Sequence, residues 1–504
     1  MSEEPFLARR IDGIAASGAA NHGELFAVRD ERHALTFAGL DRAVDAARNA
    51  LAAAGVQRGH RVVVVGGNCA ATVVLFMAIS RLGAWSVMTS DRLATAEIDA
   101  IVAHCAPRLV VRGTIDAARG SPVQTATRLS VGDLGDVPVE QSAPRADVEP
   151  DAHDIASLLY TSGTTGAPKA VMLSHANLLH VARTQARVRR YAPGDRTYCA
   201  LPIAHAGGLA SITLGTLAGG GCLQLAGRFD PEVLEAALRV DGVTVLPGVP
   251  ALHVKFAEWM RAANRELDAP RLRMVTTASS PLQEGVKAMA ESLYRLPLQN
   301  GYGLTETTAL VCQTQIDRAL PDTSVGAPFP GVRVRLVADD GTLAREGDVG
   351  EVHVVGPNRF VGYYRNDVAS QSALSSDGWF ATGDLARAGP DGRLFIVGRR
   401  KDLIKHSSFS VYPVEVESAL EAHPAVALCC VVGRAGVVDE DVIAFVELRA
   451  GARESPDALR SFAATRLAAY KRPSAVHILS QLPTLHNGKV DKASLRRLAV
   501  TLGA

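Results

Sequence analysis

A run of glycines, hydroxyl side chains and one lysine lies between two apolar stretches in the first half of the chain. It reads YTSGTTGAPKAV and starts at Tyr160. Glycine lets backbone N–H groups turn toward an anion, and the hydroxyls and the lysine add donors. The loop therefore predicts a triphosphate site, although Lys169 precedes apolar residues and not the Ser or Thr of a Walker A loop. The candidate phosphate-binding residues are Thr161, Ser162, Gly163, Thr164, Thr165, Gly166 and Lys169.

The octet NGYGLTET contains a second group of residues suited to a nucleotide. Tyr302 offers a ring face to a purine. Gly301 and Gly303 let the backbone approach a bound nucleotide closely, and Thr305 supplies a hydroxyl near phosphate. Glu306 is a hard oxygen ligand of the kind that Mg²⁺ prefers. The octet thus predicts binding of a nucleotide together with its metal ion.

Five further segments along the chain contain candidate functional residues, and most of these segments have an ordinary explanation when each is taken alone. LPIAHAGGL holds a histidine that a core could bury, and TTASSPL is typical of a Ser/Pro turn. DGWFATGDL is followed by GRRKDLIK, which is typical of a solvated basic run, and HNGKVDK places a lysine in a C-terminal turn. Their meaning comes from their order along one chain.

In this order, from about residue 35 to about residue 495, the segments resemble those of the acyl-adenylate-forming enzymes. That superfamily includes acyl-CoA synthetases, luciferases, peptide-synthetase adenylation domains and amide bond synthetases. The resemblance implies an α/β fold with a large N-terminal domain of layered sheets and helices, a small β-barrel-like part, and a small mobile α+β C-terminal domain. It places the N-terminal domain at residues 1–398, a hinge at 399–401 and the mobile domain at 402–504.

The resemblance also implies roles for four charged residues. Asp384 would hold the ribose hydroxyls, since a carboxylate can accept from both, and Arg399 would reach ribose or phosphate. Lys401 occupies the position of the family's hinge residue. Lys489 corresponds to the catalytic lysine that swings in to bind the carboxylate and the α-phosphate during adenylation.

The acyl pocket and the adenine-side loop are also implied by the resemblance. Small residues near the pocket would leave room for a ring or a medium chain. The adenine-side loop reads Ala-Ser-Ser before its proline where the family often has Gly-Gly-Ala or Gly-Gly-Glu, and Ser280 is its candidate contact. The candidate pocket residues are His205, Gly248, Ala278 and Gly301.

The implied reaction has two steps in one site, with ATP and Mg²⁺ as cofactors. A small carboxylic acid attacks the α-phosphate of ATP to give acyl-AMP and pyrophosphate, and a nucleophile then takes the acyl group. Two other hypotheses remain: a nucleotide-binding module without catalysis, which would release no pyrophosphate, and a P-loop ATPase, which would release phosphate.

The acceptor depends on the run after the hinge. Most thioester-forming relatives have a glycine before the aromatic residue there, whereas this chain has Ser407 and Ser408 before Phe409. A Cβ and a hydroxyl would narrow a tunnel for the pantetheine arm of CoA. The sequence therefore favours an amine or amino acid as acceptor, giving an amide, with His205 as a candidate base. The alternative is an acyl-CoA synthetase that forms a thioester with CoA or a carrier protein.

The elements that must position these residues follow from apolar patterns and from helix signals. Strands alternating with helices indicate α/β layers. Asp230-Pro231 marks a helix start, and residues 142–150 read as a linker. Helices are predicted over 43–54, 70–82, 414–422 and 457–468, and strands over 61–65, 155–160, 171–173, 243–246, 274–277, 332–337, 349–355, 393–397, 426–432, 442–448 and 475–479.

Composition excludes several classes of protein. The 504 residues carry a net charge of +1, which gives no support for nucleic acid or an anionic membrane as partner. Seven scattered cysteines without a C-x-x-C pair predict neither a zinc site nor a disulfide framework, and they favour a reduced, cytoplasmic location. The N-terminus lacks the apolar region of a signal peptide. Residues 203–227 contain no charged side chain, but their seven glycines favour a buried strand and helix over a membrane span.

Overall fold

The structure is a computed structural model. It describes residues 9–112, 127–141, 148–149, 154–161, 169–389, 391–406, 409–436, 439–485 and 489–502. Residues 162–166 of the expected phosphate loop, Ser407, Ser408 and most of the expected linker lie outside the described residues. None of the described helices combines the length and the apolar character that crossing a lipid bilayer requires.

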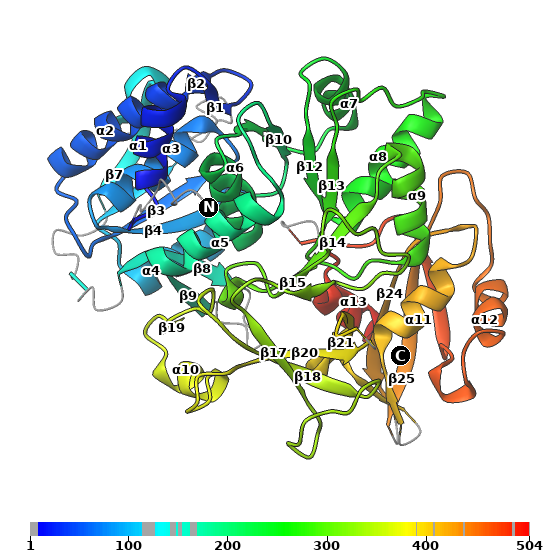
Figure 1. The fold of residues 1–504 in the computed structure, drawn as a ribbon. Coiled ribbons are helices and arrows are strands. Elements are labelled where there is room, and N and C mark those ends of the chain that lie inside the picture. The colour runs from blue at the N-terminus through cyan, green and yellow to red at the C-terminus, as the bar shows by residue number, and fades with distance from the viewer. Residues whose placement is uncertain are drawn as a thin grey trace.

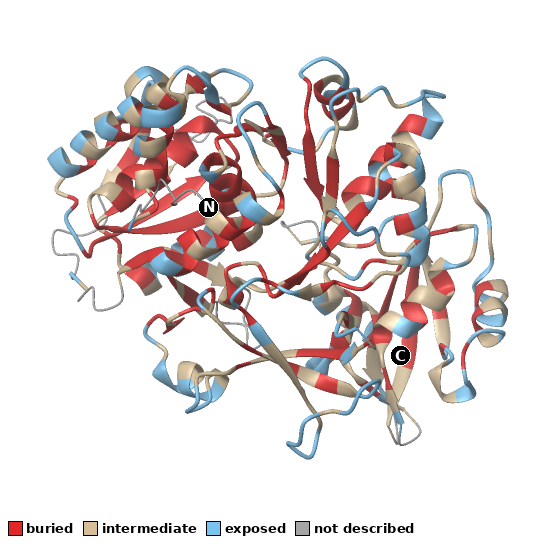
Figure 2. Ribbon diagram, viewed as in Figure 1, coloured by how far each residue is buried: buried red, intermediate tan, exposed pale blue. Residues whose placement is uncertain are grey.

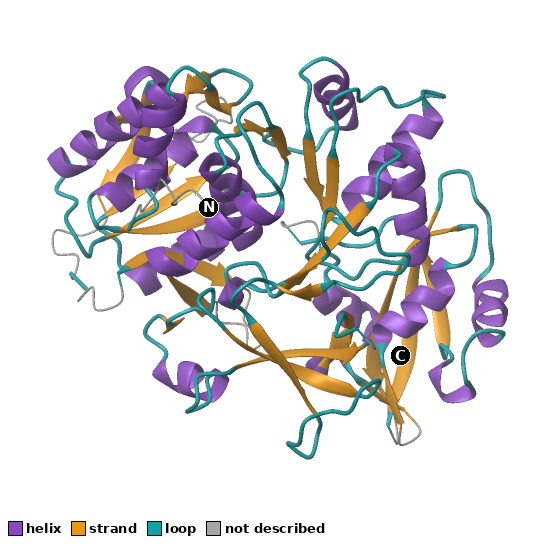
Figure 3. Ribbon diagram, in the orientation of Figure 1, coloured by secondary structure: helices purple, strands orange, loops and turns teal. Residues whose placement is uncertain are grey.

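Two large sheets flanked by helices form most of the described chain (Figures 1 and 3). The first has eight strands and includes both strands that flank the expected phosphate loop. The central strands of this sheet run parallel and are buried. Strand β3 fits this position because it contains four consecutive valines and is buried along its whole length. In sheet order the strands are β19 (Gly362–Tyr363), β9 (Lys169–Ser174), β8 (Ile155–Thr161), β4 (Trp85–Ser90), β3 (Arg61–Gly66), β5 (Leu109–Arg112), β7 (Asp136–Gln141) and β6 (Thr127–Ser130).

The second sheet has nine strands and carries the NGYGLTET octet at the end of β14. Its strands β10 to β14 run parallel where they pair with one another, and β15 and β16 turn back antiparallel at one edge. In sheet order the strands are β16 (Ala327–Pro328), β15 (Cys312–Gln313), β14 (Leu298–Tyr302), β13 (Met274–Thr277), β12 (Val245–Gly248), β10 (Arg196–Cys199), β11 (Cys222–Leu225), β1 (Phe26–Arg29) and β2 (Ala34–Thr36).

The helices of these layers bury one face each, apart from α3, whose residues Ala70–Ser80 are buried throughout. Figure 2 shows the strands largely buried and the outer faces of the helices exposed. The prediction that a helix begins at Asp230-Pro231 is confirmed, because the Asp230 carboxylate accepts from the first backbone N–H groups of α7. The helices are α1 (Gly13–His22), α2 (Phe37–Ala53), α3 (Ala70–Arg81), α4 (Thr95–Cys105), α5 (His175–Val188), α6 (Gly215–Ala218), α7 (Pro231–Arg239), α8 (Pro250–Ala262) and α9 (Glu284–Tyr294).

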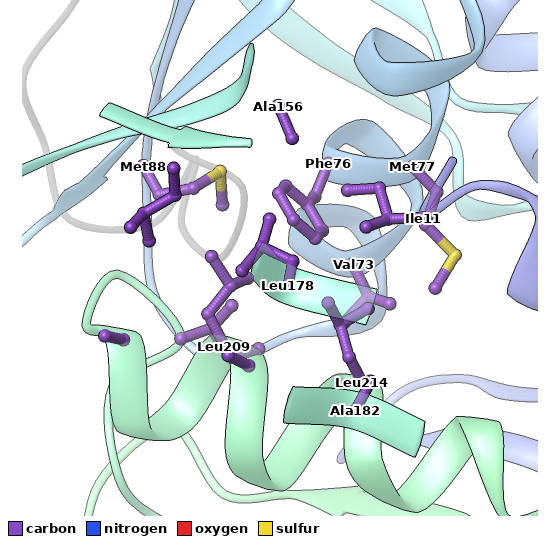
Figure 4. Close-up of a cluster of buried hydrophobic side chains, with 14 of the residues drawn as sticks. Ile11, Val73, Phe76, Met77, Met88, Ala156, Leu178, Ala182, Leu209 and Leu214 are labelled. Atoms are coloured by element: carbon purple, nitrogen blue, oxygen red, sulfur yellow. The ribbon is translucent and has the colours of Figure 1, made fainter. Parts of the chain in front are cut away.

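The uncharged stretch over 203–227 packs into the core as predicted. It forms a π-helix, η2 (Gly207–Leu214), then the short helix α6 and strand β11. Figure 4 shows η2 and α5 packed against α3 and the first sheet through apolar side chains. The side chains labelled there are Ile11, Val73, Phe76, Met77, Met88, Ala156, Leu178, Ala182, Leu209 and Leu214.

A four-stranded antiparallel sheet follows, with order β17 (Arg333–Val337), β18 (Val349–Val355), β20 (Phe380–Ala388) and β21 (Leu394–Arg399). The expected Asp-Gly turns are present, since Gly341 and Gly392 have φ values of 84° and 75°. The longest strand of this sheet, β20, was not predicted because its glycine and alternating polar residues hide the pattern. Helix α10 (Asp367–Ala373) lies before β20.

The last part of the chain is an α+β unit, which Figure 1 places on the side away from helices α1–α3. It contains a hairpin of β22 (Ile404–His406) and β23 (Phe409–Val411) and a three-stranded sheet of β24 (Val426–Ala435), β25 (Glu440–Leu448) and β26 (Ala475–Leu479). Helices α11 (Pro413–Glu421) and α12 (Pro456–Ala464) confirm the predicted ones, whereas α13 (Lys492–Thr501), capped by Asp491, was not predicted.

A buried carboxyl in this unit predicts a pH-dependent stability. Glu421 Oε1 accepts from the Cys429 N–H at 2.8 Å, and Oε2 is buried without a hydrogen-bond partner among the described residues. Burial raises the pKa of Glu421 to about 8. Because the folded pKa lies above the ordinary value of 4.5, the folded chain holds the proton more tightly, and stability falls as pH rises from about 4.5 to about 8.

We therefore expect the melting temperature of Glu421→Gln to fall less between pH 6 and pH 8 than that of the parent. At pH 8 the variant should have the higher melting temperature. The slope attributable to one proton is about 1.4 kcal/mol per pH unit at most. Asp457→Asn, which changes an exposed carboxylate of the same unit, is the control and should leave the decline unchanged. An identical pH dependence in Glu421→Gln and the parent would show that Glu421 does not hold a proton.

Candidate active site

Three of the candidate nucleotide residues meet in one hydrogen-bonded cluster. Asp384 on β20 lies opposite Arg399 on β21, and Asp384 Oδ1 accepts from Arg399 Nε at 2.8 Å. Asp384 Oδ2 accepts from the Tyr302 hydroxyl at 2.7 Å, which joins the four-stranded sheet to the end of β14. Burial and the Asp384 charge raise the pKa of Tyr302 well above its ordinary value, so the phenol stays protonated and donates. The Asp384 carboxylate is thus fixed from both sides.

Lys489 approaches the same cluster from the C-terminal unit. Burial lowers its pKa, and so does the Arg399 charge, while the Asp384 charge raises it. These interactions place the ammonium group within electrostatic reach of both residues. The backbone is held by a hydrogen bond from the Leu485 N–H to the Lys489 carbonyl at 2.7 Å and by the bridge between Thr484 and Val490. The charges of the candidate ribose site therefore act on a lysine that is distant in sequence.

The expected hinge lies in a 3-10 turn, η4 (Arg400–Asp402), with an anchor on each side of Lys401. Arg400 donates to Glu351 of β18 at 2.9 Å, and Arg496 of α13 donates to Asp402 at 2.6 Å. Burial lowers the pKa of Lys401, and the neighbouring Arg399 charge adds to this effect. The turn thus connects the four-stranded sheet to the last helix, and the hinge role of Lys401 stays a prediction.

The ends of the expected phosphate loop are described, although Ser162, Gly163, Thr164, Thr165 and Gly166 are not. Thr161 of β8 pairs with Lys169 of β9 in an antiparallel ladder. Lys169 Nζ lies 5.1 Å from the ring centroid of Tyr363, and the Tyr363 hydroxyl donates to Glu306 Oε1 at 2.8 Å. The structure therefore brings the candidate phosphate lysine over the ring of Tyr363 and the candidate metal ligand to its hydroxyl.

Backbone packing around the NGYGLTET octet explains why one of its glycines cannot carry a side chain, which the sequence did not predict. A Cβ on Gly303 would lie 2.0 Å from the Ala309 carbonyl oxygen, so glycine is required by the chain itself. A Cβ on Gly301 would make only an ordinary contact, 3.5 Å from the Cys312 carbonyl oxygen. Thr305 begins the 3-10 turn η3 (Thr305–Thr307), and its carbonyl accepts from the Thr308 N–H at 3.0 Å.

The expected acyl-pocket residues are distributed over three segments. His205 precedes η2, and its carbonyl accepts from the Leu209 N–H at 2.9 Å. A Cβ on Gly248 would lie 2.7 Å from His253 Nε2, so packing against that imidazole requires glycine, and the place of Gly248 in the acyl pocket stays a prediction. Ala278 and Ser280 are half-buried in the loop after β13.

The adenine-side loop contains a strained residue between these two. Ser279 has a φ of 73°, in the left-handed region that favours glycine, and the family often has glycine at this position. We expect Ser279→Gly to stabilise the protein by about 1 kcal/mol. The measurement is the free energy of unfolding in denaturant. Ser280→Gly is the control, because Ser280 does not have a positive φ and glycine there should give no gain.

Two residues that position the site were missed by sequence reasoning. Asn358 is fully buried, and its amide donates to the Thr307 carbonyl at 3.1 Å and to the Leu310 carbonyl, which fixes the turn after Glu306. Tyr363 contacts Lys169 and Glu306 as described above. An aromatic pair after a glycine in VGYYRND was the only visible signal for Tyr363, and no signal marked Asn358.

Among the described residues, no three His, Cys, Asp or Glu side chains cluster as a metal site. Glu306 nevertheless fits Mg²⁺, which is commonly held by one or two carboxylates together with water and substrate phosphates. The Tyr363 hydrogen bond fixes one oxygen of that carboxylate. The donor set therefore suits a metal ion that arrives with a nucleotide.

Two protein-family models match this chain. The family model described as AMP-binding enzyme matches residues 16–364, which is more than half of the chain. The chain belongs to the AMP-binding enzyme family. A second model, AMP-binding enzyme C-terminal domain, matches residues 415–489. As a member of this family the protein is an ATP-dependent, AMP-forming ligase that makes an acyl-adenylate, and this prediction is confirmed.

The likeness to known proteins extends over nearly the whole chain. The chain is 33% identical to a feruloyl-CoA synthase from an Amycolatopsis species, over 94% of this chain and 95% of that protein. ATP-bound MatB from Rhodopseudomonas palustris gives a TM-score of 0.84 at 28% identity, covering 98% of this chain and 99% of that one. The amide bond synthetase McbA from Marinactinospora thermotolerans gives 0.82 at 25% identity, covering 97% and 99%. These structures confirm the predicted fold class.

The same MatB without nucleotide gives a lower TM-score of 0.75, at the same 28% identity and with coverage of 98% and 100%. Since the two forms share one sequence, the difference in score reports shape. The protein described here is therefore closer in shape to the ATP-bound form of MatB than to the form without nucleotide.

Proposed function

We propose that this enzyme converts a small carboxylic acid into its acyl-adenylate and then transfers the acyl group to CoA. The observation that carries the first step is the hydrogen-bonded cluster of Tyr302, Asp384 and Arg399, and the charges of Arg399 and Asp384 act on the pKa of Lys489. The CoA acceptor is supported by the relatives, since the feruloyl-CoA synthase matches 94% of this chain. This choice replaces the amine acceptor favoured by the sequence, because Ser407 and Ser408, on which that preference rested, lie outside the described residues.

In the adenylation step the protein contributes positioning and charge. Asp384 would accept from the ribose hydroxyls, with its orientation fixed by Tyr302 and Arg399. Lys489 would neutralise the charge that develops between the attacking carboxylate and the α-phosphate. Lys169 would contact the phosphates, and Glu306 would hold Mg²⁺, which neutralises phosphate charge when bound.

In the transfer step the C-terminal unit would rotate about Lys401 and withdraw Lys489. Two of the side-chain contacts that this rotation must break join the C-terminal unit to the start of α9 and to α8. Ser418 donates to Gln283 at 2.5 Å, and Arg449 lies 3.8 Å from Glu258.

An amine acceptor remains the second candidate, because McbA, an amide bond synthetase, matches the fold over 97% of this chain. In that reaction His205 would serve as the base that takes the proton of the amine. We place the enzyme in the cytoplasm, without a nucleic-acid partner, on the basis of seven buried free cysteines and a net charge of +1.

The test supplies ATP, Mg²⁺ and a panel of acids that includes ferulic acid, with either CoA or a mixture of amines and amino acids. The products are identified by mass spectrometry. We expect acyl-CoA with at least one acid and no amide above the background without enzyme. Amide formed faster than thioester would overturn the CoA assignment, and absence of pyrophosphate with every acid would favour a nucleotide-binding module.

A further inference from the structure

Tyr363 occupies the junction between the candidate phosphate lysine and the candidate metal ligand. Its hydroxyl donates to Glu306 Oε1 at 2.8 Å, and Lys169 Nζ lies 5.1 Å from its ring centroid. The side chain is buried, with 7% of the residue surface exposed. A buried phenol that donates to a carboxylate restricts the rotation of both groups.

Backbone hydrogen bonds explain why Tyr363 lies between Lys169 and Glu306. Strand β19 adds to the edge of β9, where Tyr363 pairs with Val171, two residues after Lys169. The Tyr364 N–H donates to the Ala170 carbonyl at 2.8 Å, and the Phe360 N–H donates to the Glu306 carbonyl at 2.8 Å. Backbone hydrogen bonds therefore connect three elements: the strand β9 after the phosphate loop, the turn that carries Glu306, and the segment around β19.

We propose that Tyr363 is a positioning residue for adenylation, because its hydroxyl holds Oε1 of Glu306 and presents Oε2 to the metal ion of the nucleotide. The inference rests on the proposed metal role of Glu306. Groups that hydrogen-bond a metal ligand typically change metal affinity or activity by about 10- to 100-fold when they are removed. Tyr363→Phe removes the hydroxyl but keeps the ring beside Lys169.

The adjacent Tyr364 provides a matched control. The Tyr364 hydroxyl donates to Glu149 at 2.6 Å, whereas the Tyr363 hydroxyl donates to Glu306. Tyr364 is also buried. Tyr364→Phe therefore removes an equivalent hydroxyl from an equivalent environment without touching the candidate metal ligand.

The experiment measures binding of α,β-methylene-ATP by calorimetry, once with Mg²⁺ and once with a chelator, so that no turnover is needed. The ratio of the two affinities is the gain due to the metal. We expect Tyr363→Phe to reduce this gain about 10-fold or more, with metal-free affinity unchanged. Tyr364→Phe should keep the gain of the parent, and both variants should have melting temperatures close to each other. In turnover, Tyr363→Phe should need more Mg²⁺ for half-maximal rate.

Glu306→Gln separates failure of this inference from failure of the metal assignment. If Glu306→Gln loses the gain and Tyr363→Phe keeps it, the positioning role is wrong and the metal role stands. If the parent shows no gain, or Glu306→Gln keeps it, the metal role is wrong and the inference falls with it. A loss caused by Tyr363→Phe that persists undiminished in the Glu306→Gln background would also overturn the proposal, since the hydroxyl would then act through another group.

Discussion

Replacing Lys489 with alanine should slow acyl-adenylate formation by about 10²- to 10³-fold, the typical cost of losing one charge contact in a transition state. The loss should fall on the rate, because ATP binding depends mainly on other groups. Lys489 lies between β26 and α13, outside the helices and strands, so we expect the fold to persist in this variant. The measurement is pyrophosphate release in a single turnover with saturating ATP and acid.

Two controls accompany this variant. Lys255→Ala removes an exposed lysine of α8 and should leave pyrophosphate release unchanged. Transfer from synthetic acyl-AMP to CoA should survive in Lys489→Ala, because the lysine is proposed to leave the site before that step. Pyrophosphate release at the parent rate would show that Lys489 is not the adenylation lysine.

Replacing Asp384 with alanine should weaken ATP binding by about 10²-fold. Hydrogen bonds to a charged group contribute about 1.5–3 kcal/mol each, and the carboxylate would accept from two ribose hydroxyls. The change also leaves the Tyr302 hydroxyl and Arg399 without their partner, so some loss of stability is expected as well. Calorimetry with an ATP analogue, performed well below the melting temperature, gives the affinity directly.

Asp377→Ala tests whether this effect is specific to Asp384. Asp377 lies in the same sequence segment, is exposed, and faces Arg335 at 3.6 Å. We expect its loss to leave ATP affinity unchanged. Equal affinity in Asp384→Ala and the parent, with both folded, would remove Asp384 from the ribose site.

Local sequence signals were sufficient to predict elements that depend on neighbouring residues alone. Four consecutive valines predicted the buried strand β3, and Asp230-Pro231 predicted the start of α7, because each signal acts within one turn or one strand. Helix α2 begins at Phe37, earlier than predicted, because the Thr36 hydroxyl caps it by accepting from the Gly39 N–H. That cap lies before the alanine-rich run on which the prediction rested.

Partners across the fold could not be predicted in the same way. Tyr302 was predicted to offer its ring to a purine, and the structure adds that its hydroxyl fixes Asp384, 82 residues away. Gly248 was predicted to lie near the acyl pocket, and the structure adds that the absence of a Cβ there makes room for His253. Both outcomes depend on which strands become neighbours, and nothing in the local sequence records that choice. Motif order predicted the candidate site, whereas the hydrogen bonds among its described residues required the structure.

The most direct test of the account is isotope exchange between labelled pyrophosphate and ATP, measured with a panel of acids and without any acceptor. The account predicts exchange that depends on the acid, because acyl-AMP forms reversibly in this site before CoA is needed. Release of ADP and phosphate, or the absence of exchange with every acid including ferulic acid, would contradict it.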